Sequence, residues 1–113
     1  MTHIPAPAEM EPTPIVGATI LSGEPKAAGS ILYSTPDGRG TVGLFSCTPG
    51  KFRFTLEAEE FTHLLAGHIV IETDAGETID ATAGDTYILP AGQSMLIDIR
   101  ETITDVYLSW SDA

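Results

Sequence analysis

The chain has 113 residues, enough for one domain around a single hydrophobic core and too few for two. Hydrophobic residues make up 42% of it and charged residues 19%, proportions that are typical of a globular domain and exclude a disordered tail. Sixteen acidic residues against five basic ones give a formal net charge of -11, which repels phosphate backbones and anionic lipids, so we expect neither nucleic acid nor a membrane as partner.

The compartment is also constrained by the sequence. The longest apolar runs are far shorter than the roughly 18 residues that a membrane-spanning helix needs. Residues 1–16 lack the basic start and apolar run of an export signal. Cys47 is the only cysteine and so cannot form an internal disulfide, as expected in a reducing compartment. A cytoplasmic location is predicted.

Residues 1–14 differ in composition from the rest of the chain. They carry four prolines among small and acidic residues, which disfavours both a helix and the donation of hydrogen bonds to a sheet. We predict an extended arm over residues 1–14 and one folded domain over residues 15–113.

From Ile15 onward, short apolar or alternating runs are separated by turn dipeptides such as Asp37-Gly38 and Ala83-Gly84. β-Branched and aromatic residues dominate these runs, as they do in strands. The predicted strands are residues 18–21, 30–34, 41–47, 52–57, 61–66, 68–73, 77–82, 85–90, 94–100 and 104–110. So many short strands indicate an all-β sandwich or jelly roll.

One segment also has a helical alternative. Residues 56–67, LEAEEFTHLLAG, contain good helix formers, and Gly67 would suit a helix C-terminus. The strands and turn signals on both sides favour the β interpretation.

Two stretches carry a resemblance to a known family. In the first, Glu60 is followed after six residues by Gly67; in the second, Gly84 is followed after five residues by Pro90-Ala91-Gly92. These spacings resemble the end of the first cupin motif and the start of the second. The resemblance implies the cupin fold, a double-stranded β-helix or jelly-roll barrel, with Gly67 and Gly84 at hairpin corners where φ is positive.

The wider pattern covers roughly residues 40–108 and resembles one branch of small, single-domain, RmlC-like cupins. It includes the glycines, Phe45, Pro49 and Arg53 of residues 43–53, and later Glu101 and Tyr107. This branch contains proteins similar to the EutQ cupin and to the cupin domain of ureidoglycine aminohydrolase. Members commonly carry a tryptophan and a basic residue at the positions that read Ile97 and Asp105 here, so the roles of those residues do not transfer.

The metal ligands of the family are missing. Metal-binding cupins supply a His-x-His pair shortly before the motif glutamate and a further histidine after the second-motif glycine. The histidine pair would fall here on Phe54 and Leu56, or on Arg53 and Thr55. The later histidine would fall on Met95. None of these side chains replaces an imidazole ligand. We therefore expect no metal and no other cofactor.

Strand alternation predicts which side chains face the barrel interior. Glu60 and Thr62 would face inward, with Met95 and Ile97 on an apolar floor, and Arg53 and Thr55 would join them on the polar register of residues 52–57. The expected ligand-binding residues are Arg53, Thr55, Glu60, Thr62, Tyr87, Met95 and Ile97. Arg53 near Glu60 would be either a structural ion pair or a clamp for a small carboxylate or amide.

Three functions remain open at this point. The first is a metal-free cupin that binds a small molecule in its barrel. The second is a metal-independent isomerase, lyase or hydrolase in which Glu60 is the catalytic acid or base. The third is a structural or partner-binding role. A homodimer is compatible with all three, because C2 pairing would cover an apolar sheet face.

Overall fold

A computed structural model describes residues 1–7, 9–15 and 17–111, and all regular secondary structure in these ranges is β. The strands are β1 (Glu11–Thr13), β2 (Thr19–Ser22), β3 (Ala27–Ser34), β4 (Gly40–Cys47), β5 (Gly50–Thr55), β6 (Glu59–Thr73), β7 (Thr78–Thr82), β8 (Thr86–Leu89) and β9 (Ser94–Trp110). The expected all-β fold class is confirmed. Because the described residues form no helix, none of them belongs to a helix long and apolar enough to cross a membrane.

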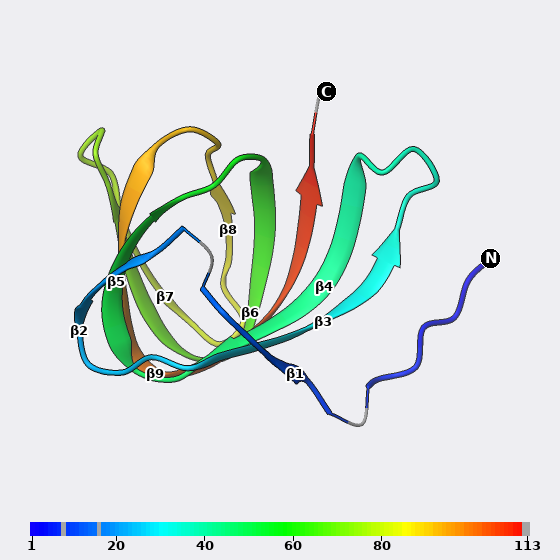
Figure 1. Cartoon of the computed structure of the whole chain (residues 1–113), viewed down its shortest axis with the longest axis horizontal. Helices are drawn as coiled ribbons and strands as arrows, with labels where there is room; N and C mark the ends of the chain where they lie inside the picture. Colours follow the sequence, from blue (N-terminus) through cyan, green and yellow to red (C-terminus); the bar gives the residue numbers. More distant parts are fainter. Residues whose placement is uncertain (8, 16, 112–113) are drawn as a thin grey trace.

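The strands form one continuous antiparallel sheet that curls into an open barrel (Figure 1). Its main path runs β1-β3-β4-β9-β5-β2, and β6 joins it by pairing with β9 while also pairing with β7 and β8. Two long strands, β6 and β9, therefore run through both halves of the barrel. In one half β9 lies between β4 and β6, and in the other it lies between β5 and β6.

The curl is located where β6 and β9 bend against each other. Gly67 lies at this point, in the middle of β6, with φ of +94°. A Cβ at this position would overlap the carbonyl oxygen of Thr102 and lie 2.8 Å from the Cα of Ile103. Two separate constraints therefore require glycine at this position: the backbone conformation and the close approach of β9. The positive φ was expected, whereas the predicted hairpin corner is wrong because the chain continues as one strand.

The bend also changes which side chains of β6 face inward. Leu64 pairs with Asp105, but Ile69 pairs with Ile99, so five steps along β6 match six along β9. A shift of one residue reverses the faces of a strand. Inward positions on β6 are therefore even-numbered up to Leu64 and odd-numbered from Ile69, as the burial of the strand confirms.

The curled sheet encloses the hydrophobic core. Phe52, Ile97 and Ile71 lie side by side on neighbouring strands, and each is at most 3% exposed. Cys47 is fully buried, and burial raises the pKa of its thiol to about 11, which makes it a poor nucleophile. Most of the core comes from the inward faces of β4, β5, β6 and β9, and Ala27 of β3, Ala81 of β7 and two residues of β8 complete it.

The N-terminal arm contributes to the sheet, contrary to the expectation that its prolines would prevent this. Glu11, Pro12 and Thr13 pair with Gly29, Ala28 and Ala27 of β3. β1 is an edge strand, so Pro12 can occupy a position in which its missing N–H removes no interior ladder bond. The arm therefore closes one side of the barrel.

Gly67→Ala should destabilise the fold strongly, because the new methyl group adds overlap with β9 to an unfavourable backbone conformation. We expect a loss of about 3 kcal/mol or more in the free energy of unfolding, measured by urea denaturation. Gly76→Ala is the matched control: Gly76 also has a positive φ, of +88°, but open space around it, and should cost about 1 kcal/mol. Equal losses in the two variants would contradict the role assigned to close approach at Gly67.

Candidate functional site

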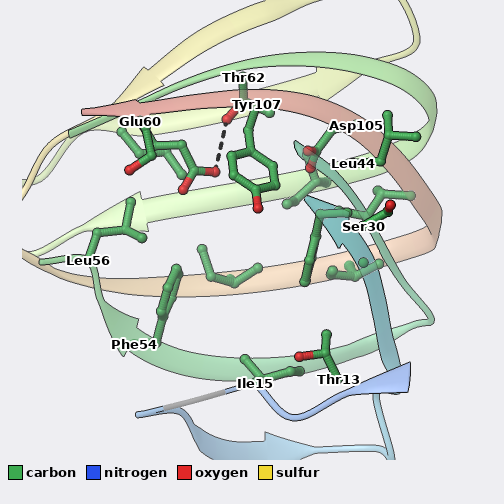
Figure 2. Close-up of a pocket in the computed structure, with 18 of the residues that line it drawn as sticks. Thr13, Ile15, Ser30, Leu44, Phe54, Leu56, Glu60, Thr62, Asp105 and Tyr107 are labelled. Carbon is green, nitrogen blue, oxygen red and sulfur yellow. Dashed lines mark hydrogen bonds between the residues drawn. The ribbon is translucent and has the colours of Figure 1, made fainter. Parts of the chain in front are cut away.

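The barrel contains a cavity of about 610 Å³, which is within the range of small-molecule pockets. Side chains from β1, β3, β4, β5, β6, β8 and β9 line it, so it occupies the inside of the curl (Figure 2). Thr13 and Ile15, from the N-terminal part of the chain, form one wall. The strand formed by the arm is therefore part of the cavity.

The deeper part of the cavity is apolar. Inward alternation along β9 brings Ile97 and Ile99 opposite Ile71 and Ile69 of β6. Phe52 and Phe54 extend this surface on β5, with their ring centroids 5.9 Å apart. Such a floor can bind the hydrocarbon part of a ligand.

Polar side chains gather in the other half of the cavity. Thr62 on β6 lies opposite Tyr87 of β8 on one side and Tyr107 of β9 on the other. The Thr62 hydroxyl donates to Glu60 Oε1 at 3.4 Å. Figure 2 shows Glu60, Tyr107 and Asp105 pointing into the same space, with the Tyr107 ring between the two carboxyl groups. An apolar floor with a few convergent polar groups is typical of a binding site.

Asp105 is the most unusual of these groups. It is only 4% exposed, and its Oδ1 is buried without a hydrogen-bond partner. Burial, and secondarily the negative charge of Glu60, raise the pKa of this carboxyl to about 8. Asp105 is therefore largely protonated at neutral pH.

The other ionisable groups of the cavity shift in the same direction. Burial raises the pKa of Glu60, although the hydrogen bond from Thr62 opposes this. The pKa values of Tyr87 and Tyr107 are also raised, first by burial and then by the carboxylates of Glu60 and Asp105. The cavity thus disfavours negative charge on Glu60, Asp105 and the two tyrosines.

Four of the seven expected ligand-binding residues line the cavity. These are Glu60, Thr62, Tyr87 and Ile97. Met95 is fully buried in the core as predicted, but it does not line the cavity. Arg53 and Thr55 face the exterior, because the inward side chains on this part of the chain are Phe52, Phe54 and Leu56.

The structure does not bring Arg53 to Glu60. Arg53 Nη1 lies 3.1 Å from Asp74 Oδ1 and 3.3 Å from Ser94 Oγ, on the outer surface. The register of residues 52–57 is fixed by the pairing of Phe54 with Met95, which places both apolar side chains inside. The expectation of an Arg53–Glu60 pair is therefore wrong, and Arg53 cannot clamp a ligand in the cavity.

Asp105 is the functional candidate that sequence reasoning missed. The alternation that places Ile97 and Ile99 inward continues through β9 and also places Asp105 and Tyr107 inward. That signal was present in the sequence, but an aspartate in a strand is ordinarily assigned to the solvent face.

The donor groups of the cavity do not fit a transition-metal centre. Phe54 and Leu56 occupy the wall where the family resemblance places a histidine pair. His63 and His68 lie outside the cavity and bond to Thr86 and Asp80. Within residues 1–7, 9–15 and 17–111, no three His, Cys, Asp or Glu side chains come together as metal ligands.

Together these features define a small, open jelly-roll barrel that holds a mainly apolar cavity with a carboxyl-rich wall. The chain belongs to the EutQ-like cupin domain family, whose model matches residues 34–107. A comparison with curated protein sequences finds no significant match.

Solved structures support the same fold. A putative ethanolamine utilization protein, EutQ, from Salmonella typhimurium is 22% identical, with a TM-score of 0.66, covering 91% of this chain and 98% of its own. The Clostridium difficile EutQ protein is 19% identical, with a TM-score of 0.66, and the match covers 76% of this chain and 68% of that protein. A Pseudomonas syringae protein of unknown function reaches a TM-score of 0.78 at 18% identity, covering 90% of this chain and 44% of its own. At these identities the likeness establishes the fold alone.

The raised pKa of Asp105 makes stability depend on pH. Its pKa is about 8 in the folded state against an ordinary value of 3.8, so folding is favoured while the group is protonated. The free energy of unfolding should therefore be highest near pH 4 and fall by several kcal/mol as the pH rises to about 8, because one pKa unit is worth about 1.4 kcal/mol.

Asp105→Asn should flatten this pH profile and stabilise the protein at pH 8, as measured by urea denaturation across the pH range. Asp85→Asn, at an exposed turn position, is the control and should keep the wild-type slope. A wild-type slope in Asp105→Asn would show that Asp105 is not the group responsible. Any smaller slope that remains in this variant is expected from Glu60, whose pKa is shifted in the same direction.

Proposed function

We propose that this chain is a metal-free cupin that binds a small molecule inside its barrel. The observation that carries the proposal is the cavity of about 610 Å³, in which an apolar floor faces a wall of convergent polar side chains. The histidine positions of metal-binding relatives are taken by Phe54 and Leu56, which add to the apolar surface. The free and buried Cys47 supports action in a reducing compartment such as the cytoplasm.

The position of the N-terminal wall supports ligand entry at this side of the barrel. Thr13 and Ile15 belong to a segment held by the short edge strand β1, whereas the opposite wall belongs to the long strands β6 and β9. Short edge elements open at lower free energy than a central sheet. Displacement of this segment would admit a ligand without disturbing the core.

A neutral, apolar fluorophore should bind in the cavity. We expect N-phenyl-1-naphthylamine to bind with one site per chain, detected by its increased emission. Leu56→Trp, which places a larger side chain in the cavity wall, should weaken this binding at least tenfold. Leu65→Trp, at a position that is 50% exposed and outside the cavity, should leave the affinity unchanged. Unchanged binding in Leu56→Trp would place the probe elsewhere and count against the proposal.

We further propose that the outer face of the sheet forms a homodimer interface. Tyr33, Val42, Leu108, Phe61 and Ile88 lie directly opposite one another across β3, β4, β9, β6 and β8. Four of them are between 38% and 55% exposed. Adjacent uncharged side chains on five strands form a contiguous apolar row, which a second copy would cover.

Leu108→Lys should convert the dimer to a monomer, because it places a charge at the centre of this row. Sedimentation velocity at micromolar concentration would measure the change. Leu21→Lys is the control: Leu21 is 54% exposed on β2, outside the row, and its replacement should leave the dimer intact. Wild-type protein that sediments as a monomer would refute the homodimer.

A further inference from the structure

The cavity contains acids and no bases. Carboxyl groups line it from three elements, Glu11 of β1, Glu60 of β6 and Asp105 of β9. In the described part of the chain, none of the lysine, arginine or histidine side chains lines it. A ligand that carries a carboxylate or phosphate would therefore find no cationic side chain to pair with there.

Asp105 supplies a second, independent observation. Its side chain lines the cavity, the residue is only 4% exposed, and its Oδ1 has no hydrogen-bond partner in the described structure (Figure 2). A buried polar atom without a partner is unfavourable and rare in proteins. A molecule that occupies the cavity can supply the partner that the Asp105 carboxyl group lacks.

The neighbouring groups are suited to a charged donor. Glu60 and the hydroxyl groups of Thr62 and Tyr107 lie on the same wall, where they present further acceptor oxygens. The aromatic rings of Phe52 and Phe54 lie on the apolar side of the cavity. An ammonium group has three donors and a positive charge, and therefore matches this wall, while its hydrocarbon part matches the floor.

We propose that the cavity selects a primary amine in its ammonium form, with the charged group at Asp105 and Glu60 and an apolar body over the Phe52–Phe54 surface. This inference rests on the proposed small-molecule binding and specifies the class of ligand.

A consequence is that binding is linked to a proton. In the empty cavity, burial and the charge of Glu60 favour the protonated form of Asp105. The other titratable groups that line the cavity are Glu60 on β6, Tyr87 on β8, Tyr107 on β9 and Glu11 on β1, none of which is cationic. An ammonium ion favours the carboxylate, so Asp105 loses its proton to solvent as the amine binds. Amine affinity therefore increases with pH up to about 8.

The first test compares three ligands with the same body and different head groups, by calorimetry in phosphate buffer at pH 8. These are 3-phenylpropylamine, 3-phenylpropan-1-ol and 3-phenylpropanoate. We expect the amine to bind at least tenfold more tightly than the alcohol, and the carboxylate to bind most weakly. Equal affinity for amine and alcohol, or preference for the carboxylate, would overturn the cation selectivity while leaving small-molecule binding intact. Failure of all three ligands and of the neutral fluorophore would count against the proposed function itself.

The second test identifies the residues responsible. Asp105→Asn and Glu60→Gln keep the shape of the cavity wall but remove a carboxylate, and each should weaken amine binding at least tenfold while changing alcohol binding less than threefold. Asp85→Asn should change neither. Between pH 6 and pH 8, wild-type affinity for the amine should rise by a factor of ten or more, and Asp105→Asn should lose most of this rise. Wild-type amine affinity in Asp105→Asn, or an amine affinity independent of pH, would overturn the assignment.

Discussion

The whole structure depends on the contact between β6 and β9 at Gly67. These two strands are shared by both halves of the barrel, and they bend where Gly67 meets Thr102 and Ile103. A side chain there would separate the strands, and the sheet would flatten. β4 and β5 pair with β9, and β7 and β8 pair with β6. The bend in β6 and β9 therefore determines how far the sheet closes and how large the interior is.

The same bend explains why one half of the interior is apolar and the other polar. Beyond Gly67 the side chains of β6 that line the cavity are Ile69 and Ile71, whereas before it they are Glu60 and Thr62. β9 shows the same division, with Ile97 and Ile99 on one side of the bend and Asp105 and Tyr107 on the other. Each half of the cavity is thus a continuous surface made by both strands, and a bound molecule would meet both surfaces.

Much of this arrangement follows from the sequence. Alternation and turn residues predict the strands, and the spacing of Glu60 and Gly67 indicates the family and places Glu60 and Thr62 inside. What alternation cannot supply is the one-residue shift at the bend, because it depends on which residues of β9 pair with β6. The wrong placement of Arg53 has a related cause. Which face of residues 52–57 points inward depends on how this strand pairs with β9, and the sequence of the strand alone does not show this pairing. The pairing of β1 with β3 was not predicted, because the prolines of residues 1–14 argue against a strand. An edge strand nevertheless tolerates proline.

Asp105 is the side chain that most constrains what the cavity can hold. Burial and the nearby charge of Glu60 make it costly to ionise Asp105. In the empty cavity Asp105 therefore keeps its proton, which takes the place of a counter-ion. A metal would need several neutral or anionic ligands around one point, and Phe54 and Leu56 leave the carboxyl groups without such partners. An organic cation needs only one end of the molecule to be charged, and its remainder gains free energy from the apolar floor. The replacement of ligating side chains by hydrophobic ones therefore need not abolish cation binding; it changes the kind of cation that the cavity fits.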